Sequence, residues 1–282
     1  MAHRPYRSVL YIPASKERAL DKARALPADA IIFDLEDAVA PDEKTAARDL
    51  LKIALAEGGF GARARIVRIN GLDTEWGSGD LAQFAADPNV DALLVPKVSR
   101  VADLDNVAAA AHGKPLWAMM ETASGMLNAA QIAQHPSLFG MVMGTNDLAK
   151  ELGSRHRVDR LPLQAGLSLC LLAAKAHDRV IIDGVYNAFK DDDGLRSECA
   201  QGRDMGFDGK TLIHPAQIEI ANRAFAPSEA EVTTARRQIE AFNAAQAAGQ
   251  GVAVVDGKIV ENLHIVTAQA TLAKARAIAE MA

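Results

Sequence analysis

Short apolar segments alternate with longer stretches of helical composition along most of the chain. Segments of this length, rich in Val, Ile and Leu, are typical of strands that are buried on both faces of a parallel sheet. Eight of them occur in order: SVLYIP from Ser8, AIIFDLE from Ala30, ARIVRIN from Ala64, ALLVPKV from Ala92, LWAMMET from Leu116, GMVMGT from Gly140, VIIDGVY from Val180 and GKTLIH from Gly209. Eight strands, each followed by a helix, predict an α/β fold in the form of a closed (β/α)8 barrel.

The predicted barrel domain comprises residues 1–226, and the sequence marks the N-termini of several of its helices. Ser15 is a suitable N-cap for the helix SKERALDKARAL. Pro41 and Pro162 stand at the first position of two further helices, where the fixed φ of proline suits the helix and its missing N–H costs nothing.

A C-terminal extension, residues 227–282, follows the barrel. The sequence predicts a long helix after Pro227, a hairpin in GVAVVDGKIVE with its turn at Asp256 and Gly257, and a last helix from about His264. A lone hairpin cannot bury both of its faces. We therefore expect the extension to cover a barrel mouth, either its own or that of a neighbouring subunit in a homo-oligomer.

Composition and charge restrict the classes of partner. The net charge is only −5 and 24% of residues are charged, so no overall field favours nucleic acid or an acidic membrane surface. No apolar run approaches the roughly 20 residues that span a bilayer, and the opening residues lack an apolar targeting core. Cys170 and Cys199 have no metal-ligand spacing and form no disulfide framework. We expect a soluble cytoplasmic protein.

Chemically versatile residues lie at or just beyond the ends of the predicted strands. Since active sites of such barrels lie at the carboxyl ends of the strands, we expect Glu36, Arg68, Lys97, Glu121 and Asp147 to converge at one mouth.

The pair Glu121 and Asp147 comes from adjacent strands, and two carboxylates with room for water suit Mg²⁺, with Mn²⁺ as a substitute. The alternatives are a salt bridge for Glu121 and an N-cap role for Asp147 in DLAKEL. Gly144, Thr145 and Asn146 would bring the backbone close to a ligand.

Arg68 could hold a substrate carboxylate through two parallel hydrogen bonds, or it could pair internally with Glu36 or Asp37. Both roles are compatible, since a neighbouring carboxylate can orient an arginine that also contacts a ligand. Lys97 could form a Schiff base, but a role as charge partner of the acidic DLED run is favoured.

Two weaker signals remain. Lys16, Arg18, Lys22 and Arg24 form a cationic patch on the first helix, which suits a phosphate-bearing group but is also typical of a solvated helix face. His214 ends the eighth strand, and a non-catalytic role is favoured. The chain has no G-x-S-x-G segment, so it gives no support to a serine hydrolase.

The opening segment from Ser8 to Arg48, followed by VRIN, VPKV, METASG, MGTNDLA and KTLIHPAQ in that order, resembles the citrate lyase β-subunit-like branch of the HpcH/HpaI aldolase superfamily. The resemblance implies a barrel that uses Mg²⁺ to act on CoA thioesters of small hydroxy dicarboxylic acids. It implies Glu121 and Asp147 as metal ligands and Arg68 on the substrate carboxylate. Tyr11, Lys16 and Lys22 would contact the CoA ester, and the resemblance also implies a trimer or hexamer.

One position departs from the lyases of this family, which carry a catalytic aspartate in the C-terminal segment where this chain has Glu261 in KIVENLH. The longer side chain moves the carboxylate by about 1 Å, which can cost ~100-fold in a geometry-dependent step. That cost disfavours carbon–carbon cleavage in this chain. The resemblance then implies hydrolysis of (3S)-malyl-CoA to malate and CoA, with Glu261 as general base on water.

The alternatives keep the same site. They are malyl-CoA, β-methylmalyl-CoA or citramalyl-CoA cleavage at a carbon–carbon bond, a citrate lyase β subunit that needs an acyl carrier protein, and a regulatory acyl-CoA-binding barrel.

Overall fold

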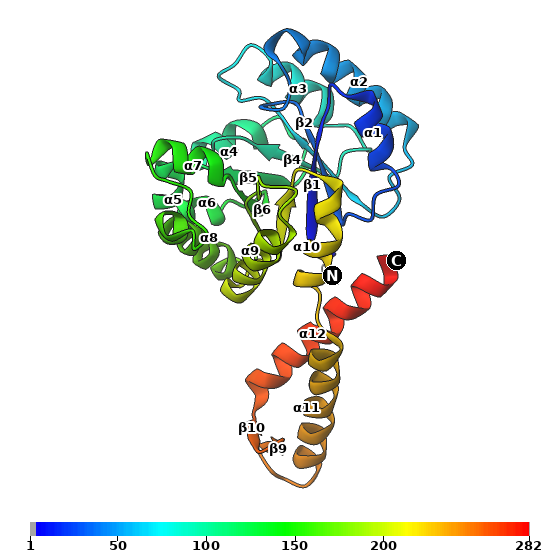
Figure 1. Cartoon of the computed structure of the whole chain (residues 1–282), viewed down its shortest axis with the longest axis vertical. Helices are drawn as coiled ribbons and strands as arrows, with labels where there is room; N and C mark the ends of the chain where they lie inside the picture. The colour runs from blue at the N-terminus through cyan, green and yellow to red at the C-terminus, as the bar shows by residue number, and fades with distance from the viewer. Residues whose placement is uncertain (1–3, 282) are drawn as a thin grey trace. The chain divides into compact units, whose positions relative to one another are not determined.

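The computed structural model describes residues 4–281, and within them the predicted barrel is confirmed. Eight parallel strands pair in chain order, and the eighth closes on the first (Figure 1). The strands are β1 (Ser8–Pro13), β2 (Ala30–Asp34), β3 (Ala64–Arg68), β4 (Ala92–Val95), β5 (Leu116–Met120), β6 (Leu138–Met143), β7 (Val180–Asp183) and β8 (Gly209–Leu212).

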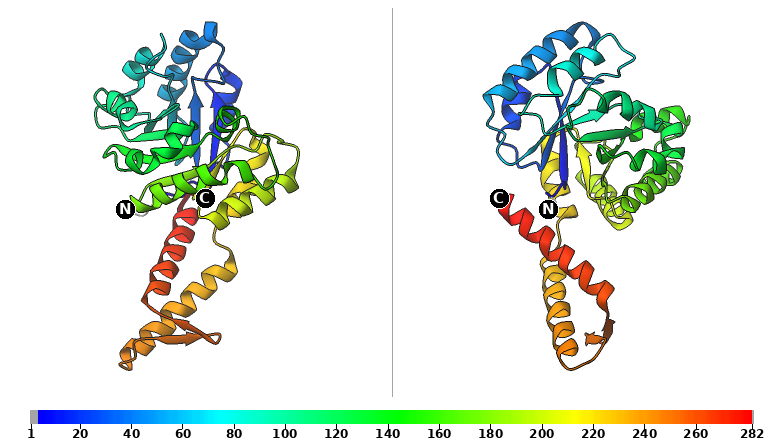
Figure 2. Two further views of the ribbon diagram at one scale, coloured as in Figure 1. Left: turned by 90° about the vertical axis from the view of Figure 1, so that its left-hand side faces the viewer. Right: turned by 180° about the vertical axis from the view of Figure 1, so that it is seen from behind.

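Helices surround the strands in every view of this part of the chain (Figure 2). They are α1 (Glu17–Ala23), α2 (Lys44–Glu57), α3 (Gly77–Phe84), α4 (Val101–Ala108), α5 (Ala123–Leu127), α6 (Ala129–Ala133), α7 (Thr145–Glu151), α8 (Gln164–Ala176), α9 (Asp192–Met205) and α10 (Ile218–Phe225). Short 3₁₀ turns, η1 (Pro41–Glu43), η2 (Leu161–Leu163) and η3 (Pro215–Gln217), precede α2, α8 and α10, so Pro41 opens a helix as predicted.

The prediction for Ser15 is wrong. The residue at the N-cap of α1 is Lys16, which provides no side-chain cap, and the buried Ser15 hydroxyl has no hydrogen-bond partner within the described residues. Helix α1 is also short and starts two residues after Ser15. A serine can cap only when it is the residue that immediately precedes the first helical turn.

The barrel interior is filled by apolar side chains from successive strands, among them Ile32, Ile66, Leu94 and Val142. The largest is Trp117 on β5, whose ring meets Tyr6 edge-on at 5.2 Å. Gly140 on β6 makes room for it, because a Cβ there would lie 2.7 Å from the indole. The interior is therefore a packed core, and ligands can bind only beyond the strand ends.

A buried ion cluster lies between β7, β8 and α9. Asp183 accepts a hydrogen bond from Arg160 at 2.7 Å and another from Lys210 at 3.1 Å, and Lys210 also donates to Glu198 at 2.6 Å. Two cations and two anions make the cluster neutral, as buried charges require.

Close contacts divide the chain into two compact units, one comprising Tyr6–Ala224 and the other containing Phe225 and the residues after it. The second unit holds α11 (Glu229–Ala247), the hairpin β9 (Ala253–Val255) and β10 (Lys258–Val260), and α12 (Asn262–Met281), which returns beside α11 (Figure 2). The hairpin turns at Asp256 and Gly257, both with positive φ, as the sequence predicted. Its apolar residues pack with Phe242 and Ile265 in a small core of their own.

Candidate functional site

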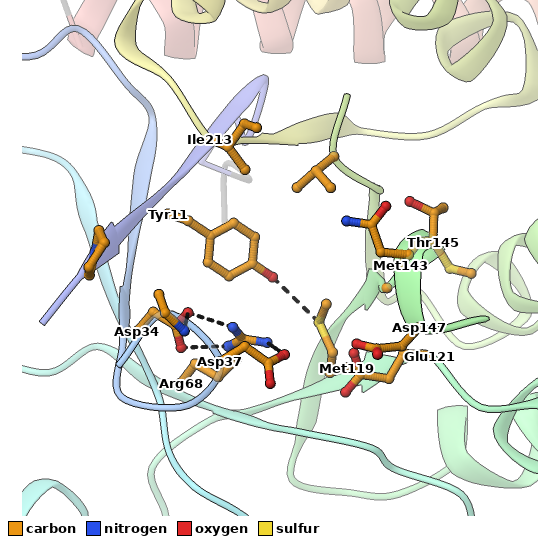
Figure 3. A pocket seen from close by; sticks show the side chains of 15 residues that line it. Tyr11, Asp34, Asp37, Arg68, Met119, Glu121, Met143, Thr145, Asp147 and Ile213 are labelled. Atoms are coloured by element: carbon orange, nitrogen blue, oxygen red, sulfur yellow. Dashed lines mark hydrogen bonds and ion pairs between the residues drawn. The ribbon is translucent and has the colours of Figure 1, made fainter. Parts of the chain in front are cut away.

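A cavity of about 360 Å³ opens beyond the carboxyl ends of the barrel strands (Figure 3). Its polar lining comes from β1, from the ends of β2 and β3, from the residues that follow β2 and β5, and from the first turn of α7. Eight residues singled out in the sequence line it, namely Tyr11, Asp37, Arg68, Glu121, Gly144, Thr145, Asn146 and Asp147. Of the five residues expected to converge, Arg68, Glu121 and Asp147 line this cavity, whereas Glu36 and Lys97 line a neighbouring one.

Glu121 follows β5 and is almost completely buried. Its Oε1 accepts a hydrogen bond from the backbone N–H of Lys97 at 2.8 Å, whereas its Oε2 has no hydrogen-bond partner within the described residues. Glu121 also forms no ion pair within residues 4–281, so the salt-bridge alternative fails. Burial raises the pKa of Glu121 to about 8, and only Arg68 and the N–H of Lys97 oppose that rise appreciably. A buried carboxylate oxygen without a donor fits a cation ligand.

Asp147 lies in the first turn of α7, one strand further around the barrel. The residue at the N-cap of α7 is Gly144, so the capping alternative for Asp147 is wrong. Within residues 4–281 the half-buried Asp147 carboxylate accepts no hydrogen bond. Like Glu121, it faces the cavity with an oxygen that receives no hydrogen bond from the described residues (Figure 3).

The donor set fits a hard divalent cation that retains open positions. No group of three or more His, Cys, Asp or Glu side chains is arranged to hold a metal ion in the described part of the chain. An ion on Glu121 and Asp147 would therefore take its other ligands from water or substrate, which is the usual coordination of Mg²⁺.

Arg68, the last residue of β3, has Asp34 as its main partner, which the sequence analysis did not identify. The two Cα atoms are direct neighbours across β2 and β3, and the guanidinium donates from Nε to Oδ1 at 2.7 Å and from Nη2 to Oδ2 at 2.5 Å. Both terminate their strands, so aligning the two strand ends would have placed them together. The predicted pairs are present as well, because Nη1 lies 2.8 Å from Glu36 Oε2 and 3.3 Å from Asp37 Oδ2.

These contacts limit what Arg68 can offer a ligand. A guanidinium has five N–H donors, of which Asp34 accepts from two and Asp37 from one on Nη1, which also forms an ion pair with Glu36. In this arrangement one N–H of Nη2 is left for a substrate carboxylate, instead of the two parallel bonds expected from the sequence.

Lys97 connects the two parts of the site. Its ammonium bonds Glu36 Oε1, while its backbone N–H reaches Glu121. Partial burial would lower the pKa of Lys97, but the hydrogen bond and charge of Glu36 outweigh it and raise the pKa. Because a Schiff base requires a neutral amine, this environment favours the charge-partner role.

The cavity wall carries an excess of negative charge. Even with Glu121 protonated, as its raised pKa favours, Asp34, Asp37 and Asp147 outnumber Arg68, the one cation among the described residues that line it. The Tyr11 ring packs against the guanidinium at 5.2 Å, and its hydroxyl donates to Met119 Sδ at 3.5 Å. Burial raises the pKa of Tyr11, so its phenol adds no further charge.

The basic residues of the first helix lie on its surface. Lys16, Arg18 and Lys22 are exposed, and Lys16 lies 3.6 Å from Glu43. Arg24 instead bonds Glu57 at 2.8 Å and covers the Phe60 ring, so it is occupied structurally.

Two other singled-out residues have structural partners. His214 caps η3 by accepting the N–H of Ala216 and stacks on Phe189. Glu261 is an exposed residue of the C-terminal unit, between β10 and α12, where its N–H donates to His264 Nδ1 at 3.0 Å.

No helix in the described residues is long and apolar enough to cross a membrane.

Comparison with known proteins agrees with this geometry. Residues 7–215 match the family model described as HpcH/HpaI aldolase/citrate lyase. The chain is 72% identical to a (3S)-malyl-CoA thioesterase of Cereibacter sphaeroides over 281 residues, which cover 99% of this chain and 98% of the relative. It is 32% identical to an L-malyl-CoA/β-methylmalyl-CoA lyase of the same species, with 98% and 96% of the two chains covered.

Among solved structures, the chain resembles the protein CitE from Mycobacterium tuberculosis in complex with magnesium, acetoacetate and coenzyme A. The TM-score is 0.81 at 30% sequence identity, covering 98% of this chain and 100% of that one. The citrate lyase β subunit of the same organism, complexed with oxaloacetate and magnesium, matches at a TM-score of 0.70 and 32% identity over 79% of this chain and 98% of the other.

Proposed function

Because the chain belongs to the HpcH/HpaI aldolase/citrate lyase family, we propose that it hydrolyses (3S)-malyl-CoA to (S)-malate and CoA with the help of Mg²⁺. The observation that carries the proposal is the 72% identity to malyl-CoA thioesterases over nearly the whole chain, against 32% to the lyases. A thioesterase and a lyase among these relatives come from the same strain of Cereibacter sphaeroides, so the two activities belong to two separate proteins there.

Glu121 and Asp147 would hold the Mg²⁺ ion through the oxygens that have no donor in the described residues. When bound, the ion supplies Lewis-acid polarisation and neutralises negative charge on the substrate. Magnesium in the related M. tuberculosis structures supports this assignment. Mn²⁺, which has similar ligand preferences, is proposed as a substitute.

Arg68 would bind the malyl carboxylate with the N–H that its acidic neighbours leave free. Asp34 fixes the plane of the guanidinium, so this N–H has one direction. Gly144, Thr145 and Asn146 line the same cavity and would lie beside the acyl group. Tyr11, Lys16 and Lys22 would contact the CoA part, and both lysines are exposed and able to meet phosphates.

Glu261 would act as general base that takes a proton from the attacking water. We propose that the protein is a homo-oligomer, a trimer or hexamer, and that residues 227–282 cover a barrel mouth so that Glu261 reaches a site in its own or a partner subunit. The carboxylate carries no other assigned role in the C-terminal unit, where only its backbone forms hydrogen bonds within residues 4–281.

The test is incubation of the purified protein with Mg²⁺ and (3S)-malyl-CoA, with free thiol and glyoxylate followed together and EDTA as control. Thiol release without glyoxylate or acetyl-CoA, abolished by EDTA, is expected. Glu261→Gln should lower the turnover number at least 100-fold, since the amide cannot accept the proton. Full activity of this variant would remove Glu261 from the mechanism.

The second candidate is cleavage of the malyl thioester to acetyl-CoA and glyoxylate, which the 32% identity to a lyase favours. Glyoxylate formed in step with acetyl-CoA would establish it and overturn the hydrolase. Activity on citrate that appears only with an added acyl carrier protein would identify a citrate lyase β subunit instead, a relative at 31% identity.

A further inference from the structure

Lys97 has a backbone conformation that lysine rarely adopts. It follows β4 and Pro96, and its φ is +51°, in the left-handed region that favours glycine and, to a lesser degree, asparagine. An unfavourable conformation at a non-glycine residue is retained only when the surrounding contacts fix it.

Two backbone hydrogen bonds, one from Lys97 and one from Val98, hold the chain on either side of that conformation. The backbone N–H donates to Glu121 Oε1 at 2.8 Å, and the next residue, Val98, donates to the carbonyl of Met119 at 3.2 Å. The left-handed turn therefore lies against the end of β5 and aims one N–H at the carboxylate.

The consequence for Glu121 is an asymmetric carboxylate. Oε1 accepts the N–H of Lys97, and Oε2 is buried and has no donor in the described part of the chain. A carboxylate held in this way cannot rotate without losing its hydrogen bond in a buried environment, where an unmade hydrogen bond is costly. It presents Oε2 as a fixed ligand.

The side chain of the same lysine acts on the other part of the site. Its ammonium is bound to Glu36 Oε1, and Glu36 Oε2 lies 2.8 Å from Arg68 Nη1. Glu36 is thus held between two cations.

We propose that Lys97 is a positioning residue with two separable functions: its left-handed backbone fixes Glu121 for a divalent cation, and its ammonium fixes Glu36 and through it Arg68. The inference rests on the proposed metal and carboxylate sites. Partners that orient a metal ligand commonly contribute 10- to 100-fold to metal affinity.

Variants chosen by backbone preference separate the two functions. Lys97→Gly and Lys97→Asn tolerate positive φ but lack the ammonium. Lys97→Val also lacks the ammonium and strongly disfavours positive φ. Calorimetric titration with Mg²⁺ should give a Kd within about threefold of wild type for the first two and at least tenfold weaker binding for Lys97→Val. All three should raise the KM for malyl-CoA, and Lys97→Arg should restore it in part.

Melting curves of the metal-free variants control for folding. If Lys97→Val does not fold, Lys97→Ala replaces it. Alanine disfavours positive φ less than valine does, so this variant should have a Kd for Mg²⁺ between those of Lys97→Gly and Lys97→Val. Equal Mg²⁺ affinity in the valine or alanine variant and wild type would overturn the backbone function, and an unchanged KM in Lys97→Gly would overturn the side-chain function. If wild type binds no Mg²⁺, the inference fails with the metal site. If it binds Mg²⁺ but releases no thiol, only the proposed reaction fails, because the titration still tests Lys97.

Discussion

Gly144 lies directly against Glu121: a Cβ at position 144 would come within 2.3 Å of Glu121 Cβ and 2.6 Å of its Oε2. Real Cβ atoms do not approach other heavy atoms so closely, so any side chain at 144 must displace the carboxylate. The glycine that follows β6 is thus part of what shapes the proposed metal site.

Gly144→Ala should therefore lose Mg²⁺ binding while it keeps the fold. We expect malyl-CoA hydrolysis to fall at least 100-fold, since ~1 Å of misplacement can have that effect, with about 1–3 kcal/mol of destabilisation from overpacking. Steady-state rates and denaturant unfolding measure both. Gly251→Ala is the control, because a Cβ there meets no atom within 4 Å. Wild-type Mg²⁺ affinity in Gly144→Ala would contradict the steric argument.

Removal of either proposed metal ligand should abolish stabilisation by Mg²⁺. A ligand at 100 times its Kd stabilises the native state by about 2.7 kcal/mol, so wild type should melt at a higher temperature with Mg²⁺ than with EDTA. Glu121→Gln and Asp147→Asn should melt at the same temperature in both. Glu280→Gln, an exposed residue of α12, should behave as wild type. A Mg²⁺-dependent shift that persists in both ligand variants would place the ion elsewhere.

Asp34→Asn should disturb the site more than Asp37→Asn, although both contact Arg68. Asp34 is buried and bidentate, whereas the Asp37 side chain is 55% exposed and 3.3 Å away. Breaking a buried ion pair costs about 3–5 kcal/mol, and an exposed one ~1 kcal/mol or less. Urea unfolding gives the stabilities, and the KM for malyl-CoA reports Arg68. Equal effects of the two substitutions would show that Asp34 does not hold the guanidinium.

The cluster around Asp183 predicts a specific pH dependence of stability. Burial would raise the pKa of Asp183, but Lys210 and Arg160 outweigh it and hold the pKa below its ordinary value. A group whose folded pKa is depressed contributes stability above its unfolded pKa and loses it as pH falls through the folded value. The contribution should be complete at pH 7 and decline only below about pH 4, the ordinary range of aspartate.

Asp183→Asn should accordingly lose about 3–5 kcal/mol at pH 7, because Lys210 and Arg160 lose a buried counter-charge. The difference from wild type should shrink as pH falls below about 4. Urea unfolding across this range measures it, with Asp193→Asn on the surface of α9 as control. A difference that stays constant to the lowest pH would mean that Asp183 is not the titrating group.

The strands could be predicted from the sequence because barrel strands are buried on both faces, which leaves continuous apolar runs. Predicted and observed starts coincide for β1 to β5, at Ser8, Ala30, Ala64, Ala92 and Leu116. β1 ends at Pro13 as predicted, but the ends of β2 to β8 were predicted too late, because the chain leaves the sheet where functional polar residues begin. β6 starts at Leu138, two residues earlier than predicted. Its second residue, Phe139, is only partly buried.

The site was predicted less completely. The convergence of Arg68, Glu121 and Asp147 follows from the order of strand ends alone. The choice among Asp34, Glu36 and Asp37 as the main partner of Arg68 also needs the register between β2 and β3, which an alignment of the two strand ends would have supplied. The left-handed backbone of Lys97 leaves no mark in the sequence, since neither glycine nor asparagine occupies that position.

The four carboxylates that face a single guanidinium in the cavity also imply an order of events. An acidic substrate that enters alone meets net repulsion, whereas a divalent cation is attracted. A cation bound at the proposed site would reduce the excess of negative charge and offer open coordination positions to the acid. By linkage the acid then strengthens the binding of the cation by the same factor. If the proposed metal site is correct, the cation and the acid should therefore bind in order, the cation first.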